Sequence, residues 1–182
     1  MTTLVVGANG ATGRLLVEQL LDQGEQVKII VRSLTNLPQT LTKNSQLMIT
    51  QANLLDMTDT QLQTQVQGCS AVISCLGHNL TFKGMFGHPR RLVSNAVQRL
   101  CEAIQTTTPD VPVKFILMNT TGNQNVQAGE TVSVAQTVIL GLIRQLLPPH
   151  ADNECAAAYL QSNFGVNQKQ IEWTAIRPDN VP

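Results

Sequence analysis

Short apolar runs alternate with amphipathic segments from the first residues of this sequence onward. Runs that are almost entirely hydrophobic are typical of strands in a parallel sheet, because helices cover both faces of such a sheet. These runs predict six strands, at residues 3–6, 27–31, 47–50, 71–76, 113–118 and 172–176.

The segments between these runs carry apolar residues at the spacing of a helix. The first contains Leu15, Leu16, Leu20 and Leu21 and ends at Gly24, a typical helix terminator. Four further helices are predicted, at residues 59–66, 92–104, 134–146 and 151–162. This alternation predicts an α/β fold, a doubly wound parallel (Rossmann) sheet with helices on both faces. Right-handed crossovers favour the strand order 3-2-1-4-5-6.

Length and charge limit the classes of protein and of partner. The 182 residues are enough for one domain with a substantial core, and no repeat or second domain is visible, so we expect one domain over residues 1–182. Twelve basic residues balance twelve acidic ones, so no net field attracts nucleic acid or an anionic membrane. Aromatic residues make up only 3%, which argues against stacking on single-stranded nucleic acid.

The cysteines and the apolar stretches of the sequence indicate where in the cell the protein is found. No pair of the four cysteines has CxxC spacing and no histidine lies at zinc-ligand spacing from them, so we expect free thiols, a reducing compartment and no metal site. The longest apolar stretch, residues 132–147, contains Arg144 and is too short to span a bilayer. Because no secretory signal is visible either, we expect a soluble, cytoplasmic protein.

The strongest motif is a glycine-rich turn, GANGATG, between the first strand and the first helix. In that context it matches the fingerprint that binds a dinucleotide pyrophosphate at a helix N-terminus. Gly7 would permit the tight turn, Gly10 would let the backbone approach the phosphates, and Gly13 would let the helix pack against the sheet. The alternative is a turn of small residues without a ligand. The strand before the motif, and the helix and second strand after it, stand in the order that a dinucleotide-binding site requires, which favours binding. The residues expected to bind the cofactor here are Gly7, Asn9, Gly10, Ala11, Thr12 and Gly13.

The end of the second predicted strand bears on the choice of cofactor. A site that prefers NAD(H) usually places Asp or Glu there, to accept a hydrogen bond from the ribose 2′-hydroxyl. This sequence has Arg32 and Ser33 instead, with no carboxylate nearby. A guanidinium offers a planar fork of donors to a 2′-phosphate, which favours NADP(H) over NAD(H). The alternatives are a solvated arginine, or Arg14 sharing the task.

Several segments together resemble a known family, the atypical short-chain dehydrogenase/reductases with NmrA-like and flavin-reductase (biliverdin reductase B)-like members. The matching segments are residues 4–14 (LVVGANGATGR), 31–33 (VRS), 53–54 (NL), 71–77 (AVISCLG) and 173–178 (WTAIRP). The likeness runs along the whole chain. Such relatives are usually longer, so the resemblance implies that a C-terminal segment on the substrate side is lacking.

The resemblance implies further positions around the cofactor. Asn53 and Leu54 would lie against the adenine, with Asn53 standing where relatives usually carry Asp. Thr120 matches the hydroxyl that faces the nicotinamide, and it is the candidate catalytic residue. Four more residues would lie near the nicotinamide half or its phosphates: Cys75, Leu76, Gly77 and His78. Pro178 would border the carboxamide.

The sequence departs from the family at its usual proton-transfer pair. Many members carry Tyr-x-x-x-Lys, or at least the Lys, on the helix after the fifth strand. Here Asn153 occupies the Lys position, and Tyr159 is followed four residues later by Asn163. Flavin-reductase-like relatives also lack the pair and rely on holding hydride donor and acceptor face to face.

These features predict an NAD(P)H-dependent oxidoreductase that transfers hydride to a flavin, a quinone or a similar small acceptor. The alternative is a non-catalytic, NAD(P)-binding redox sensor of the NmrA type, which the missing Tyr–Lys pair would equally suit. The sequence indicates neither the acceptor nor the oligomeric state.

Overall fold

A computed structural model describes residues 1–77, 90–119, 148–165 and 169–177 of the chain. It contains one six-stranded sheet with the order β3-β2-β1-β4-β5-β6, and every neighbouring pair of strands is parallel. The strands are β1 Thr2–Val6, β2 Gln26–Val31, β3 Leu47–Gln51, β4 Ala71–Ser74, β5 Val113–Met118 and β6 Ile171–Ile176. The predicted Rossmann sheet and its strand order are confirmed.

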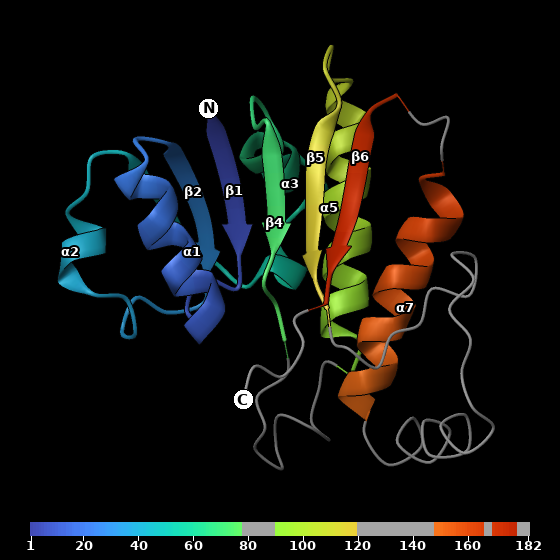
Figure 1. Cartoon of the computed structure of the whole chain (residues 1–182), viewed down its shortest axis with the longest axis horizontal. Coiled ribbons are helices and arrows are strands. Elements are labelled where there is room, and N and C mark those ends of the chain that lie inside the picture. Colours follow the sequence, from blue (N-terminus) through green and yellow to red (C-terminus); the bar gives the residue numbers. More distant parts are fainter. Residues whose placement is uncertain (78–89, 120–147, 166–168, 178–182) are drawn as a thin grey trace.

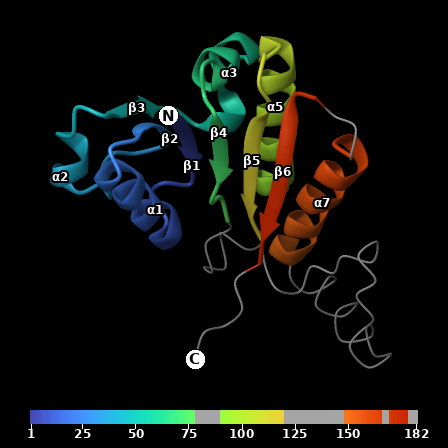
Figure 2. The same cartoon turned by 45° about the horizontal axis from the view of Figure 1, so that its top comes forward.

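Helices cover both faces of this sheet (Figures 1 and 2). The helices are α1 Ala11–Asp22, α2 Gln39–Thr42, α3 Asp59–Val66, α5 Leu92–Thr107 and α7 Pro148–Asn163, with a 3₁₀ turn η1 at Leu54–Asp56. One face packs α1 and α2 against β1, β2 and β3, and the other packs α3, α5 and α7 against β1, β4, β5 and β6. Alternate residues of a strand therefore enter different cores: Leu4 and Val6 face α5, whereas Val5 faces α1.

Most predicted elements agree with the structure to within a few residues. The buried side of α1 differs from the leucine pattern in the sequence: Gly13, Val17 and Leu21 are buried, and Leu15 is 55% exposed. The predicted helix at residues 134–146 and the apolar stretch at 132–147 lie outside the described residues. Within the described ranges, no helix is both long enough and apolar enough to cross a bilayer.

A buried carboxylate joins the start of α5 to α7. The residue before α5, Arg91, provides no side-chain cap for the helix. Instead Asp152 of α7, which is 3% exposed, accepts hydrogen bonds from the backbone N–H of Val93 at 2.7 Å and of Ser94 at 3.0 Å. It also accepts one from the Ser94 hydroxyl at 2.6 Å. A carboxylate at a helix N-terminus satisfies donors that the helix leaves free and interacts favourably with its dipole.

We predict that Asp152→Ala lowers the free energy of unfolding by about 2 kcal/mol, because it removes a cap and leaves buried donors unsatisfied. Urea denaturation followed by circular dichroism measures the change. Asp110→Ala, at an exposed position after α5, is the control and should change stability by less than about 0.5 kcal/mol. Equal effects of the two substitutions would show that Asp152 is not an anchor between α5 and α7.

Candidate cofactor-binding site

A cleft of about 620 Å³ opens at the carboxyl edge of the sheet, around the point where the chain crosses from β3 to β4. Ligands of open α/β sheets bind at such a switch point. The cleft is lined by the last residues of β1 and β2, by the residues that follow β1, β2, β3 and β4, and by the first residue of α5. The predicted site residues that line it are Gly7, Asn9, Gly10, Arg32, Ser33, Asn53, Leu54, Cys75, Leu76 and Gly77.

The glycines of the first turn allow three backbone segments to meet. Gly7 has φ +82°, and a Cβ there would collide with the backbone carbonyl of Cys75. A Cβ on Gly13 would collide with the carbonyl of Gly7. Because neither residue has a side chain, α1 begins directly against the end of β1, and the end of β4 lies directly beside it.

The N-terminus of α1 is a favourable place for an anion. Gly10 is the N-cap residue and has no side chain to satisfy the helix, and no acidic residue lies in the first turn. The N–H groups of the first turn have no partner within a helix, and the helix dipole adds positive potential there. Ala11, Thr12 and Gly13 form this turn; Gly10, just before them, lines the cleft itself.

Asn9 joins the first turn to the second. Its Nδ2 donates a hydrogen bond of 2.7 Å to the backbone carbonyl of Ser33. Its Oδ1 is buried and has no hydrogen-bond partner in the described part of the chain. A buried acceptor without a partner is unusual in a folded protein and is commonly satisfied by water or a ligand.

The turn after β2 carries the charge of the cleft. Arg32 is exposed, and of the described residues that line the cleft it is the one with a charged side chain. The Ser33 hydroxyl lies 2.8 Å from the Thr35 hydroxyl and accepts a hydrogen bond from the Thr35 N–H. Asn36, three residues after Ser33, also lines the cleft and was not among the predicted residues. Its position in the turn that follows β2, close to Arg32, is the feature of the sequence that could have identified it as a site residue.

The turn after β3 presents an amide with one free end. Asn53 is exposed, and its Nδ2 donates a 2.8 Å hydrogen bond to the Asp56 carboxylate. This bond orients the amide and leaves its Oδ1 available as an acceptor. Leu54, the next residue, is buried. A hydrogen-bond acceptor beside an apolar surface is the pattern that an adenine base with an exocyclic amino group requires.

The turn after β4 is mostly apolar. Burial raises the pKa of the Cys75 thiol, so at neutral pH this side chain is a neutral part of the wall and not a thiolate nucleophile. Leu92, the first residue of α5, lines the cleft nearby and was not predicted. All four cysteines are free, and no group of three metal-binding side chains occurs among the described residues.

Three predicted residues, His78, Thr120 and Pro178, lie outside the described residues. The structure does describe the residue before Thr120. Asn119 is 4% exposed, and its backbone N–H donates to the carbonyl of Ile176 at 2.8 Å. Its side chain donates to the backbone carbonyl of Asn153 at 3.5 Å. The ends of β5 and β6 and the helix α7 therefore meet at one point of the carboxyl edge.

Tyr159 is a residue of α7 whose ring packs against the residue that follows the helix. Its ring lies edge-on to Phe164, with 6.0 Å between the ring centroids. Burial, and then the neighbouring Cys101 and Glu102, raise the pKa of Tyr159 to about 12. A tyrosine that transfers protons in catalysis needs a lowered pKa, so this environment has the opposite effect.

A family model described as NAD(P)H-binding matches residues 7–181 of the sequence. The chain belongs to this NAD(P)H-binding family. Its cofactor is thus a nicotinamide dinucleotide. No curated protein matches the chain in a comparison of sequences.

Solved structures share the fold of this NAD(P)H-binding chain at low sequence identity. The oxidoreductase ylbE from Lactococcus lactis is 19% identical, with a TM-score of 0.65 over 98% of this chain and 68% of that one. A proposed NADH-flavin reductase from Streptococcus pneumoniae is 21% identical, with a TM-score of 0.66 over 98% and 71%. The anaerobilin reductase ChuY from Escherichia coli is 15% identical, with a TM-score of 0.61 over 98% and 72%.

The cleft of this NAD(P)H-binding chain fits a dinucleotide. The glycines bring the ends of β1 and β4 and the start of α1 together at the cleft, and the first turn of α1 offers N–H donors there. Asn9 and Asn53 each offer an oxygen acceptor, and Arg32 offers a cation.

We predict that Gly7→Ala lowers the free energy of unfolding by about 3 kcal/mol, because it combines a strained φ with a backbone collision. Gly68→Ala is the matched control: its φ is +73°, but a Cβ there meets nothing within 4 Å, so the expected loss is about 1 kcal/mol. Urea denaturation of both variants gives the difference. Equal losses would mean that the contact between the first turn and β4 is not tight.

We predict that Tyr159 stays un-ionised in the folded protein well above pH 10. The sequence contains one tyrosine, so the ultraviolet absorbance of the phenolate reports on it alone. With a pKa of about 12, roughly a tenth should be ionised at pH 11, against about nine tenths in urea-unfolded chain. The raised pKa stabilises the folded state below pH 10, and this contribution is lost between pH 10 and 12. A folded-state midpoint near 10 would contradict the packing role.

Proposed function

We propose that this chain is an NAD(P)H-dependent oxidoreductase that transfers hydride to a small, flat acceptor such as a flavin or a quinone. The observation that carries the proposal is the cleft at the carboxyl edge, where the glycine turn and the open N-terminus of α1 meet. The reductase names of two structural neighbours support the reaction type. The acceptor class is inferred from the absence of a Tyr–Lys pair in the sequence.

Each part of the dinucleotide has proposed partners. The pyrophosphate would lie over the N–H groups of the first turn of α1, beside Gly10, which lines the cleft without a side chain, while Gly7 and Gly13 let the backbone segments around it meet. The adenine would lie against Leu54 and donate its amino group to the Asn53 oxygen. The remaining part of the cofactor would run past Cys75, Leu76 and Gly77 toward His78, Thr120 and Pro178.

The chemistry would depend on orientation. Reduced nicotinamide supplies a hydride, which carries two electrons, and a flavin or quinone completes its reduction with a proton from solvent. The chain would hold the nicotinamide in place through Thr120 and exclude water from its buried face. Tyr159 takes no proton in this scheme, which agrees with its raised pKa. Holding two reactants at reacting distance is itself a large source of rate.

We propose a second candidate function for the same cleft. In a non-catalytic sensor of the NmrA type, the bound dinucleotide would control a partner interaction. Asn153 stands where many family members carry Lys, and this substitution favours the sensor hypothesis as much as it favours a flavin-reductase-like enzyme. A screen of flavins and quinones, followed through the nicotinamide absorbance, separates the two. Multiple turnovers with an acceptor support the enzyme, and binding without turnover supports the sensor.

We propose further that the chain prefers NADP(H). No carboxylate lies among the described residues that line the cleft, so none is placed there to accept from a ribose 2′-hydroxyl. The exposed guanidinium of Arg32 and the Ser33 hydroxyl follow β2, where a 2′-phosphate would lie. The Streptococcus pneumoniae neighbour is named for NADH, so the preference rests on this turn alone.

We predict that Arg32→Ala weakens NADPH binding by about thirtyfold and leaves NADH binding within about twofold, because one charge-assisted contact to the 2′-phosphate is lost. Titration followed by nicotinamide fluorescence measures both dissociation constants. Lys43→Ala removes an exposed cation outside the lining of the cleft and should change neither. A parallel loss for NADPH and NADH in Arg32→Ala would refute the 2′-phosphate contact.

A further inference from the structure

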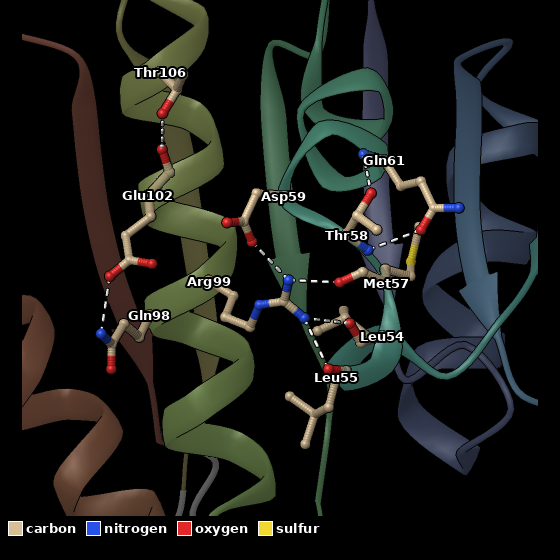
Figure 3. Close-up of polar contacts among 10 residues, drawn as sticks. All are labelled: Leu54, Leu55, Met57, Thr58, Asp59, Gln61, Gln98, Arg99, Glu102 and Thr106. Atoms are coloured by element: carbon tan, nitrogen blue, oxygen red, sulfur yellow. Dashed lines mark hydrogen bonds and ion pairs between the residues drawn. The ribbon is translucent and has the colours of Figure 1, made fainter.

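A single side chain of α5 holds the turn that follows β3. The Nη1 atom of Arg99 donates hydrogen bonds to the backbone carbonyls of Leu54 at 3.2 Å and Leu55 at 2.9 Å. Its Nη2 atom donates to the carbonyl of Met57 at 2.6 Å and to the Asp59 carboxylate at 2.8 Å. Figure 3 shows the guanidinium lying between α5 and this turn, with these four acceptors around it.

The turn makes few backbone hydrogen bonds of its own. It is a 3₁₀ segment of three residues, and its local backbone bonds run from Asp56 N–H to the Asn53 carbonyl at 3.0 Å and from Met57 N–H to the Leu54 carbonyl at 3.4 Å. Short 3₁₀ turns have poor hydrogen-bond geometry. Arg99 supplies the carbonyls with charged donors in a planar fork, and such bonds are stronger than neutral ones.

The backbone carbonyls are more important to this arrangement than the ion pair. Asp59 is 87% exposed on its side chain, whereas Arg99 is 22% exposed. Exposed ion pairs contribute little to stability because water and salt screen them. The three carbonyls are fixed parts of the turn, so their bonds hold it against α5, together with the core packing of Leu54 and Met57.

This turn forms one wall of the cleft. Asn53 and Leu54 line the cleft, as does Leu92, the first residue of α5. Arg99 is not among the lining residues, so it acts through the turn it holds. We infer that Arg99 is a positioning residue for the adenosine half of the cofactor, an inference that rests on the proposed function. It fixes the distance between α5 and the wall on which the adenine would lie.

The test compares a whole dinucleotide with its nicotinamide half. Arg99→Met keeps the aliphatic stem but removes the donors, so the turn loosens and a site held less well binds its ligand less tightly. We expect the dissociation constant for NADPH to rise about tenfold, which corresponds to the loss of one to two net hydrogen bonds. Reduced nicotinamide mononucleotide has no adenosine, so its dissociation constant should stay within about twofold.

Three variants make the comparison specific. Arg99→Lys keeps the charge without the fork and should give a smaller loss for NADPH, again with none for the mononucleotide. Asp59→Asn removes the exposed ion pair and should change neither constant. Gln98→Ala is the control on the same helix, because its side chain is exposed and bonds to Glu102 at 2.8 Å, away from the turn (Figure 3).

The outcomes separate the inference from the proposed function. If folded wild-type protein binds no NADPH, the proposed function is wrong. If it binds NADPH and Arg99→Met or Arg99→Lys binds it equally well, the positioning role is wrong. A loss of equal size for NADPH and for the mononucleotide also overturns it, because it would show a general loss of structure. A loss confined to NADPH, larger in Met than in Lys, supports it.

Discussion

The contact between backbone atoms at the start of α1 determines where everything else in the cleft lies. The helix begins so close to β1 that a single Cβ on Gly13 would overlap the carbonyl of Gly7. A Cβ on Gly7 would likewise overlap the carbonyl of Cys75, which follows β4. Three backbone segments thus meet with no side chain between them, at the edge where the strand order changes direction. The N–H groups that the helix leaves free are consequently accessible to a ligand.

Side-chain bonds to the backbone connect the other loops to this point. Asn9 joins the first turn to the second through the Ser33 carbonyl, and Arg99 holds the third turn against α5. Asp152 in turn fixes the first residues of α5. Each of these bonds joins segments far apart in the sequence. The rim of the cleft, where the pyrophosphate and the adenosine are proposed to bind, is therefore joined to helices and strands of the core.

The sheet, its order and the glycine turn could be predicted because they depend on local patterns. Buried parallel strands give apolar runs, and the fingerprint needs glycine at fixed spacing within a strand–turn–helix unit. The short elements α2 and η1 were missed, since four and three residues are too few to show a period. Arg99 and Asp152 were missed for another reason: their partners lie 40 to 59 residues away in the chain, and nothing nearby marks them. Asn36 was missed although it follows Arg32 closely, because no motif contains it.

A crystal structure of this chain grown with NADP⁺ tests the central claim most directly. Our interpretation predicts density for the pyrophosphate over the first turn of α1, with the adenine against Leu54 and the 2′-phosphate beside Arg32. Density for the cofactor in the reverse orientation, or at another surface of the folded protein, would contradict it. A cleft that holds only solvent at saturating NADP⁺ would contradict it as well.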